Sequence, residues 1–224
     1  MPTTTVQIVP GPALLAQPWW SDVHRMINMA FARKDVHVFP LSWTRLDADS
    51  LLGAEGLAEE LGQTGHFGVV FFDGNPVVCG GVLPFRREDW LNPMHKSDGE
   101  AIAANGEIAM KDHQVATKHN SREQTDGQHV PEWMICCFCI HPDYRRRGLG
   151  HVMLNVLVDF IKDRGARRLV ANYAIEESGK YWYAMGFKHE VGPDSVVNKG
   201  YTYRPDLEPL REDVHYRMTA MELN

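Results

Sequence analysis

Hydrophobic positions along the chain follow two different periods, which predicts a fold that combines helices and strands. Residues 3–10 have the composition of a strand, and residues 18–33 place apolar side chains three and four positions apart, as an amphipathic helix does. A second helix, weakened by two glycines, is predicted over residues 51–63. Two apolar, β-rich runs then flank Asp73-Gly74-Asn75, a turn sequence typical of a hairpin.

The pattern is clearer in the second half of the chain. Residues 148–165 repeat apolar side chains at the helical period and end in basic residues and Gly165, a typical C-terminal signature. The other elements predicted here are a buried strand over 133–142, a strand over 166–174, a short helix that begins at Ser178, a strand that begins at Gly186 and a closing strand over 214–223.

Residues 86–131 interrupt this pattern with a polar stretch. We interpret the stretch as an insertion, helical around 101–114 and partly disordered, within a single domain that spans residues 1–224. Long loops inside compact domains are usually functional lids or mobile segments. We therefore expect the insertion to cover a functional site. It holds His95, His113, His119 and His129.

Composition narrows the classes of function. The chain has 224 residues and a net charge of −6, which argues against a nucleic-acid partner and suits a cationic substrate, although solubility alone also explains it. No apolar run approaches the ~20 residues of a membrane helix, and the N-terminus has no leader pattern. Three of the four cysteines crowd into residues 136–139, which cannot form a spaced disulfide framework, so we expect a reducing compartment, the cytoplasm.

One segment points to chemistry. The buried strand leads through residues 145–150 (Arg-Arg-Arg-Gly-Leu-Gly) into the long helix, whose first free amides and positive dipole end favour a phosphate. Glycines let a bulky pyrophosphate approach the backbone. A dinucleotide fingerprint would need a third glycine at position 153, which is Met153, and no GxxxxGK[ST] phosphate loop occurs.

The segment resembles the GNAT superfamily of acetyl-CoA-dependent N-acetyltransferases, whose pyrophosphate loop reads [RQ]-x-x-G-x-[GA]. Arg145, Gly148 and Gly150 match its fixed positions, and the later strand and Gly186-Phe187 follow in the family's order. This resemblance implies an α/β fold (an α+β, three-layer arrangement), with a mixed, mostly antiparallel central sheet flanked by helices and two strands splayed at the CoA site.

The resemblance also implies how acetyl-CoA, the cosubstrate, would bind. Amides from Arg146 to His151 would hold the pyrophosphate, and the backbone of 138–140 would run along the pantetheine arm like a strand partner. The Ile140 amide could then stabilise the oxyanion. The predicted cofactor contacts are Phe138, Cys139, Ile140, Arg145, Arg146, Arg147, Gly148, Leu149, Gly150, His151, Asn172 and Ser178.

The departing thiolate needs an acid. In the family this acid is often a tyrosine four residues before the glycine of Gly-Phe, and Trp182 holds that position here. Tyr181 and Tyr183 flank it, but one residue turns a helix by ~100°, so neither replaces it unless the helix is shifted. We favour Tyr183, and a packing role for all three aromatics is the alternative. The family's asparagine is Ile175 here, with Asn172 as its substitute.

The attacking amine, whose pKa is near ~10, must lose a proton. Glu132 is the candidate base, because it begins the cofactor strand on the face of Met134 and Cys136. This is two residues away from the place where the family often has a glutamate or histidine. His129 and Asp143 are rivals, and a strand-end charge without catalytic role is the other interpretation of Glu132.

We expect no metal site. Cys137, Cys139 and His141 share a strand face, but ligands two positions apart on a strand lie ~6.5–7 Å apart. That separation is too large for one zinc ion with bonds of ~2.3 Å. The histidines of the insertion follow no metal-binding spacing.

Together these features predict an N-acetyltransferase that moves the acetyl group of acetyl-CoA to a primary amine, of a small molecule, by direct attack in a ternary complex. Residues 39–43, the insertion and residues 192–213 would wall the acceptor side. The alternatives are a peptide or protein acceptor and a non-catalytic acyl-CoA-binding module. We expect a monomer or homodimer without nucleic-acid or membrane partners.

Overall fold

The computed structural model describes residues 3–85, 131–202 and 205–224. The predicted insertion, with its four histidines and its helix, lies outside the described residues except for residue 131. The elements are β1 (Thr4–Pro10), η1 (Gly11–Ala16), α1 (Trp20–Phe31), α2 (Ser50–Leu61), β2 (His66–Phe72), β3 (Asn75–Pro84), β4 (Glu132–Ile140), η2 (Pro142–Tyr144), α4 (Leu149–Lys162), β5 (Arg168–Ala174), α5 (Ile175–Ala184), β6 (His189–Glu190), β7 (Ser195–Val197) and β8 (Val214–Glu222).

The strands form one sheet in the order β1-β2-β3-β4-β5-β8-β6, and β7 also pairs with β8. All described pairings are antiparallel except that of β4 with β5. Asp73 and Gly74, between β2 and β3, have φ of 48° and 79°, as a type I′ hairpin turn requires. The predicted hairpin and the mostly antiparallel mixed sheet are therefore confirmed.

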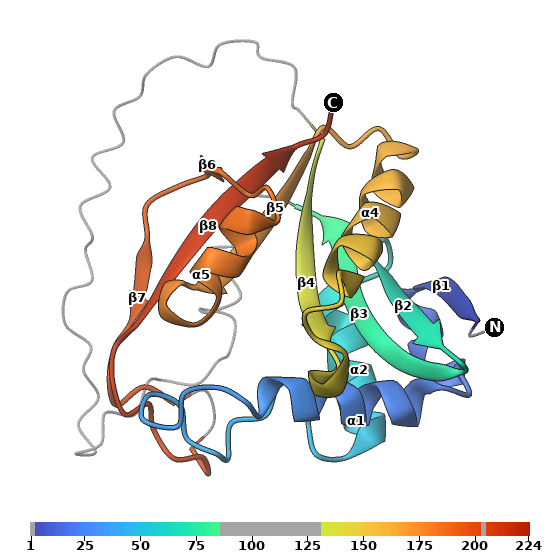
Figure 1. Cartoon of the computed structure of the whole chain (residues 1–224). Helices are drawn as coiled ribbons and strands as arrows, with labels where there is room; N and C mark the ends of the chain where they lie inside the picture. Colours follow the sequence, from blue (N-terminus) through green and yellow to red (C-terminus); the bar gives the residue numbers. More distant parts are fainter. Residues whose placement is uncertain (1–2, 86–130, 203–204) are drawn as a thin grey trace.

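The sheet splits between β4 and β5. These strands pair only from Glu132 opposite Arg168 to Ile135 opposite Ala171. β4 continues to Ile140 and β5 also runs on, but the two diverge in a V, as Figure 1 shows. The V divides the sheet into a β1–β4 arm and a β5–β8 arm, so the predicted splayed strands are confirmed.

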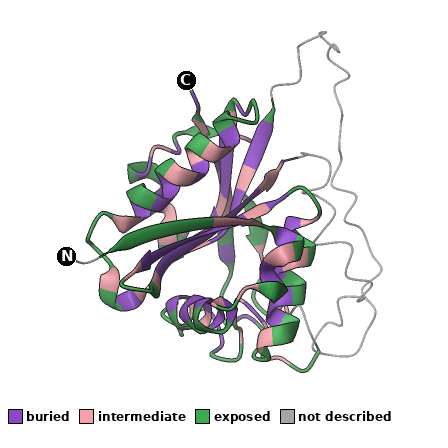
Figure 2. Cartoon of the chain, turned by 90° about the vertical axis from the view of Figure 1, so that its right-hand side faces the viewer, coloured by how far each residue is buried: buried purple, intermediate pink, exposed green. Residues whose placement is uncertain are grey.

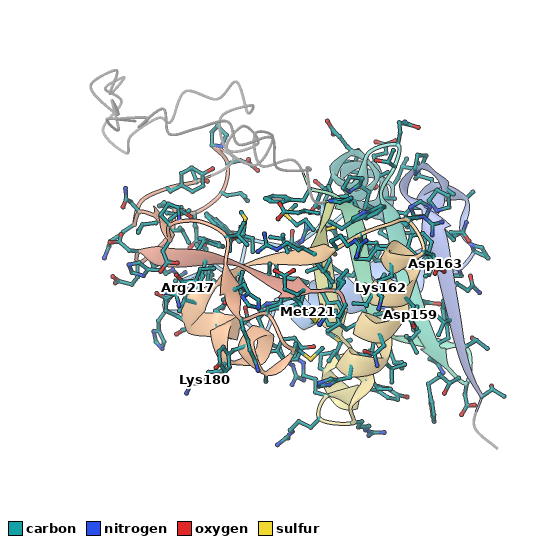
Figure 3. All side chains as sticks on the ribbon, turned by 90° about the horizontal axis from the view of Figure 1, so that it is seen from above. Asp159, Lys162, Asp163, Lys180, Arg217 and Met221 are labelled. Atoms are coloured by element: carbon teal, nitrogen blue, oxygen red, sulfur yellow. The ribbon has the colours of Figure 1, made fainter. Side chains whose placement is uncertain are left out.

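Helices cover both faces of the sheet. α4 and α5 lie on one face, where apolar residues of α4 at helical spacing, Met153, Leu157 and Ile161, are fully buried. α1 and α2 pack on the other face. Seen from above, α4 with Lys162 accompanies one arm and α5 with Lys180 accompanies the other (Figure 3).

The edge of the β1–β4 arm is exposed along most of β1 (Figure 2). Burial therefore increases from this edge toward β2 and β3, which contribute the fully buried Phe67, Val70 and Val78. The two helical layers and this sheet position the V at the centre of the molecule.

Several predicted boundaries were wrong. The helix predicted to begin at Ser178 begins at Ile175, and Ser178 donates its hydroxyl to the Ala174 carbonyl at 3.3 Å. The strand predicted to reach residue 142 ends at Ile140, because Pro142 opens η2. The strand predicted from Gly186 is reduced to β6, and β7 lies in a segment where none was predicted.

Candidate functional site

The loop before α4 has the backbone geometry of an anion-binding site. Gly148 is the N-cap residue of α4, with φ of 74°, and no side chain caps the helix there. Arg146 also has a positive φ, 61°, a conformation that non-glycine residues rarely adopt. A Cβ added at Gly148 would meet no atom within 4 Å. The loop is thus open at Gly148 and strained at Arg146, and the first amides of α4 have no acceptor within the helix.

One predicted donor of this loop is already used. The His151 amide donates to the Gly148 carbonyl at 3.0 Å. The amides up to Gly150 precede any intrahelical acceptor, so they are the ones available to a ligand. The predicted range of amides is therefore shortened by His151.

The arginine side chains have different positions. Arg145 donates Nη2 to the Ala30 carbonyl at 3.1 Å, which ties the loop to the last turn of α1. Arg147 donates to the Asp143 carbonyl at 3.2 Å and lies 5.0 Å from the Tyr144 ring centre. Arg146 is exposed. The first arginine of the motif therefore holds the loop in place in this structure.

Where β4 borders the V, it contains a bulge, and its side chains alternate between the two faces of the sheet. Cys137 has φ of 46°, and the register with β3 shifts at this point. Phe138 and Ile140 face the α4 side, whereas Cys139 packs with the α1 side. Cys139 Sγ lies 3.5 Å from Cys79 Sγ, and all four cysteines are free and buried. Residues 138–140 thus border the gap where the resemblance placed the pantetheine arm.

Of the three aromatics of α5, Tyr181 lies nearest to the pyrophosphate loop. A Cβ added at Gly150 would lie 2.4 Å from the Tyr181 hydroxyl oxygen, and the ring is 6.4 Å from that of Phe138. Burial raises the pKa of Tyr181 to about 12. Tyr183, which the sequence favoured, is 63% exposed, beside Lys188. The structure thus brings Tyr181, and not Tyr183, to the loop.

Trp182 belongs to the core. It stacks on Tyr173 at 6.2 Å and makes edge contacts with Phe187 at 5.1 Å, and it is 8% exposed. The structure therefore favours the packing role for Trp182, which was the alternative interpretation of the sequence. Of the remaining predicted contacts, Asn172 is partly exposed on β5 beyond the last pair with β4, and Ser178 is turned back onto its own helix.

Glu132 lies at the closed end of the V, away from the loop. Its Oε1 accepts from Arg168 Nη1 at 2.6 Å, and the Glu132 side chain is 6% exposed. Six residues of strand, on the order of 20 Å, separate it from Phe138. This arrangement favours the structural interpretation of Glu132. Asp143 is exposed in η2 on the loop side, and His129 lies outside the described residues.

The segment between α1 and α2 crosses the open end of the V, from one arm to the other (Figure 1). Its Asp35 amide donates to Glu177 Oε1 at 3.0 Å, and Trp43 Nε1 donates to the Glu208 carbonyl at 2.6 Å. Burial raises the pKa of Glu177. This segment contains residues 39–43, which were predicted to border the acceptor site. The Trp43 hydrogen bond brings them into contact with part of residues 192–213, which were predicted to border the same site.

The sequence missed two features of this region. Tyr181 was weighed beside Tyr183 but not chosen. Arg45 and Glu60, which pair on the face of α1 and α2, carried no motif at all. Within the described part of the chain, no group of three or more His, Cys, Asp or Glu side chains could hold a metal. No described helix is long and apolar enough to cross a membrane.

Comparisons with known proteins agree with this geometry. The family model of the acetyltransferase (GNAT) family matches residues 35–187. No curated protein gives a significant match. Among solved structures, the ribosomal-protein-S18-alanine N-acetyltransferase of Escherichia coli is similar at 14% identity and a TM-score of 0.52, over 99% of this chain and 95% of that one.

Two further structures are similar in fold. An N-acetyltransferase from Staphylococcus aureus Mu50 has 14% identity and a TM-score of 0.53, over 99% of each chain. FeeM, an N-acyl amino acid synthase from uncultured soil microbes, has 9% identity and a TM-score of 0.55, over 100% of this chain and 92% of that one. At these identities the structural likeness establishes the fold alone.

Proposed function

Because the chain belongs to the acetyltransferase (GNAT) family, we propose that it transfers the acetyl group of acetyl-CoA to the primary amine of a small molecule, by direct attack in a ternary complex. The observation that carries this proposal is the uncapped N-terminus of α4 beside the V between β4 and β5. Free amides and a positive helix end suit a pyrophosphate.

Two neighbouring segments would hold the pyrophosphate and the pantetheine arm of acetyl-CoA. Amides up to Gly150 would bind the pyrophosphate, and the unpaired edge of β4 from Phe138 to Ile140 would hydrogen-bond the pantetheine arm like an added strand. A backbone amide of this edge is also the group available to stabilise the oxyanion of the attacked carbonyl. No part of this scheme needs a metal ion.

We propose Tyr181 as the acid. The amine nitrogen forms a bond to the thioester carbon, the carbon–sulfur bond breaks, and the thiolate takes the Tyr181 hydroxyl proton. The proton lost by the nitrogen on collapse restores the hydroxyl, and the other ammonium proton goes to solvent. The position of the Tyr181 hydroxyl beside Gly150 supports this role, and the hydroxyl is protonated at neutral pH, as a general acid must be.

The bridging segment supports a small acceptor. Asp35 and Trp43 attach it to the opposite arm, so the open end of the V is crossed by chain and not left as an open groove. A peptide or protein acceptor is the alternative, and a non-catalytic acyl-CoA-binding module, first motivated by Trp182, is the third. Four free, buried thiols support a reducing compartment such as the cytoplasm.

A CoA-release assay tests the proposal. The protein is incubated with acetyl-CoA and a panel of alkylamines, arylalkylamines, polyamines, amino acids and peptides, and free thiol and acetylated product are measured. We expect turnover of a small amine. Thermal stabilisation by acetyl-CoA without any turnover would favour the binding module, and turnover of peptides alone would favour the alternative acceptor.

A further inference from the structure

On the face of the sheet opposite the pyrophosphate loop, Arg45, in the segment before α2, forms an ion pair with Glu60 in the last turn of α2. Arg45 Nη2 donates to both carboxylate oxygens of Glu60, at 2.8 and 2.6 Å. The Arg45 side chain is 26% exposed and the Glu60 side chain 34% exposed. The two side chains are therefore hydrogen-bonded to each other and remain partly accessible to solvent.

The last turn of α2 lies against the point where β4 and β5 separate. A Cβ added at Gly81 of β3 would lie 2.9 Å from Leu61 Cδ2 and 2.7 Å from Cys136 Sγ. Cys136 is the first β4 residue beyond the pairing with β5. Burial raises the pKa of the Cys136 thiol, and the neighbouring Glu60 carboxylate raises it further. The ion pair is thus close to the vertex of the V.

A cavity of about 410 Å³ lies beside Arg45, and Glu60 borders it only through its ion pair with that arginine. Its walls combine three leucines, Leu46, Leu52 and Leu57, with two charged residues, Arg45 and Asp47, and two glycines of α2. A volume of this size suits a small ligand with an apolar body. Arg45 lines the cavity and also pairs with Glu60, which neighbours Cys136 of β4. The ion pair therefore lies between the cavity and β4.

We propose that this cavity binds the acceptor as a free amino acid with an apolar side chain. This inference rests on the proposed function and names its substrate class. The α-carboxylate would bind Arg45, the α-ammonium would bind Glu60 beside the V, and the apolar side chain would lie among the three leucines.

Charge complementarity favours this occupant over a simple amine. A zwitterion presents one anion and one cation, so it replaces the Arg45–Glu60 contact by two equivalent contacts and leaves neither residue unpaired. A monoamine at Glu60 would leave the Arg45 guanidinium without its carboxylate partner, which is costly in a partly desolvated site. A bound ammonium also lies beside a carboxylate, the kind of group that accepts the proton during attack.

Substrate comparison tests the proposal without any variant. Leucine, leucinamide, the dipeptide Leu-Gly and 3-methylbutylamine share the same apolar body, and only leucine carries a carboxylate next to its amine. We expect kcat/KM for leucine to exceed that for 3-methylbutylamine by about 100-fold, which is in the range for a lost charge partner. Leucinamide and Leu-Gly should resemble the amine.

Replacing Arg45 identifies the residue that recognises the carboxylate. R45Q should lower kcat/KM for leucine by about 100-fold, so that the preference for leucine over 3-methylbutylamine disappears. R25Q removes an exposed arginine that pairs with Asp22 on α1, and this matched control should keep the preference. Acetyl-CoA affinity and the melting temperature of each variant report whether the fold is intact.

The outcomes separate the two claims. Turnover of amines with equal efficiency for leucine and 3-methylbutylamine, or a preference that survives in a folded R45Q protein, overturns the amino-acid site and leaves the acetyltransferase function standing. Absence of turnover with every amine overturns the function itself, and this inference with it.

Discussion

At the residue scale, Tyr181 of α5, and not Trp182, lies where the catalytic acid is expected. Trp182 holds the position of the family's acid but is enclosed by Tyr173 and Phe187, while Tyr181 reaches Gly150 at the start of α4. Indole cannot donate a proton to a thiolate at neutral pH, whereas a phenol can. The acid is therefore expected one position earlier than the motif indicates.

Replacing Tyr181 by phenylalanine removes only the hydroxyl. We expect kcat to fall by about 100-fold, the range for a lost general acid, with little change in acetyl-CoA affinity. Because burial holds the pKa of Tyr181 at about 12, the effect should persist throughout neutral and mildly alkaline pH. Steady-state kinetics check this, with Y183F as the control. Equal activity of Y181F and the unaltered protein would exclude Tyr181.

Glu132 offers a contrasting test, because its carboxylate is buried against Arg168. E132Q should lower the free energy of unfolding by about 2 kcal/mol, since the partly buried Arg168 then keeps only Glu222, at 3.0 Å, as an ion-pair partner among the described residues. Urea denaturation measures this loss. In the folded fraction, kcat/KM should change less than threefold. A large loss of kcat with unaltered stability would instead restore Glu132 as the base.

At the element scale, α5 is positioned by its buried side chain. Trp182 closes the α5 side of the core against β5 and the chain that follows the helix. W182A should destabilise the protein by about 3–5 kcal/mol, the usual cost of emptying a large aromatic site. The denaturation midpoint checks this, with the exposed Tyr183 changed to alanine for comparison. A loss under 1 kcal/mol would mean that Trp182 does not anchor the helix.

Elements with a strong period were predictable, and those that depend on distant contacts were not. The apolar spacing of α4 and the Asp73-Gly74 turn specify their structures locally. α5 was placed late because Ser178 resembles a capping residue, yet its hydroxyl bonds back within the helix. β7 exists only by pairing with β8, from Ser195 to Val197, and nothing in its own sequence indicates that partner.

The candidate site divides in the same way. The pyrophosphate loop could be identified from consecutive residues, because Gly148 and Gly150 act through their own backbone. Arg45 and Glu60 are 15 positions apart and meet only after α2 has packed on the sheet. No local pattern encodes such a pair, so it could not be predicted without the fold.

At the scale of the whole molecule, the two faces of the sheet carry the two proposed binding sites. The α4 face brings the free amides up to Gly150, and the α1 and α2 face brings the cavity beside Arg45. The V lies between these two sites, because β4 beyond Ile135 and β5 beyond Ala171 no longer pair with each other. The proposed function requires that acetyl-CoA binds at the amides on the α4 face.

Calorimetric titration of acetyl-CoA into two glycine variants tests this requirement most directly. Gly148 and Gly165 lie just beyond the two ends of α4, both with positive φ (74° and 81°) and with open space around them. Glutamate costs a similar backbone strain of ~1–2 kcal/mol at either position, but only at Gly148 does it set a carboxylate against the pyrophosphate.

We predict that G148E weakens acetyl-CoA binding by about 100-fold or more while remaining folded, and that G165E binds acetyl-CoA as the unaltered protein does. Equal affinity of G148E and G165E, or no binding of acetyl-CoA by the unaltered protein, would contradict this prediction.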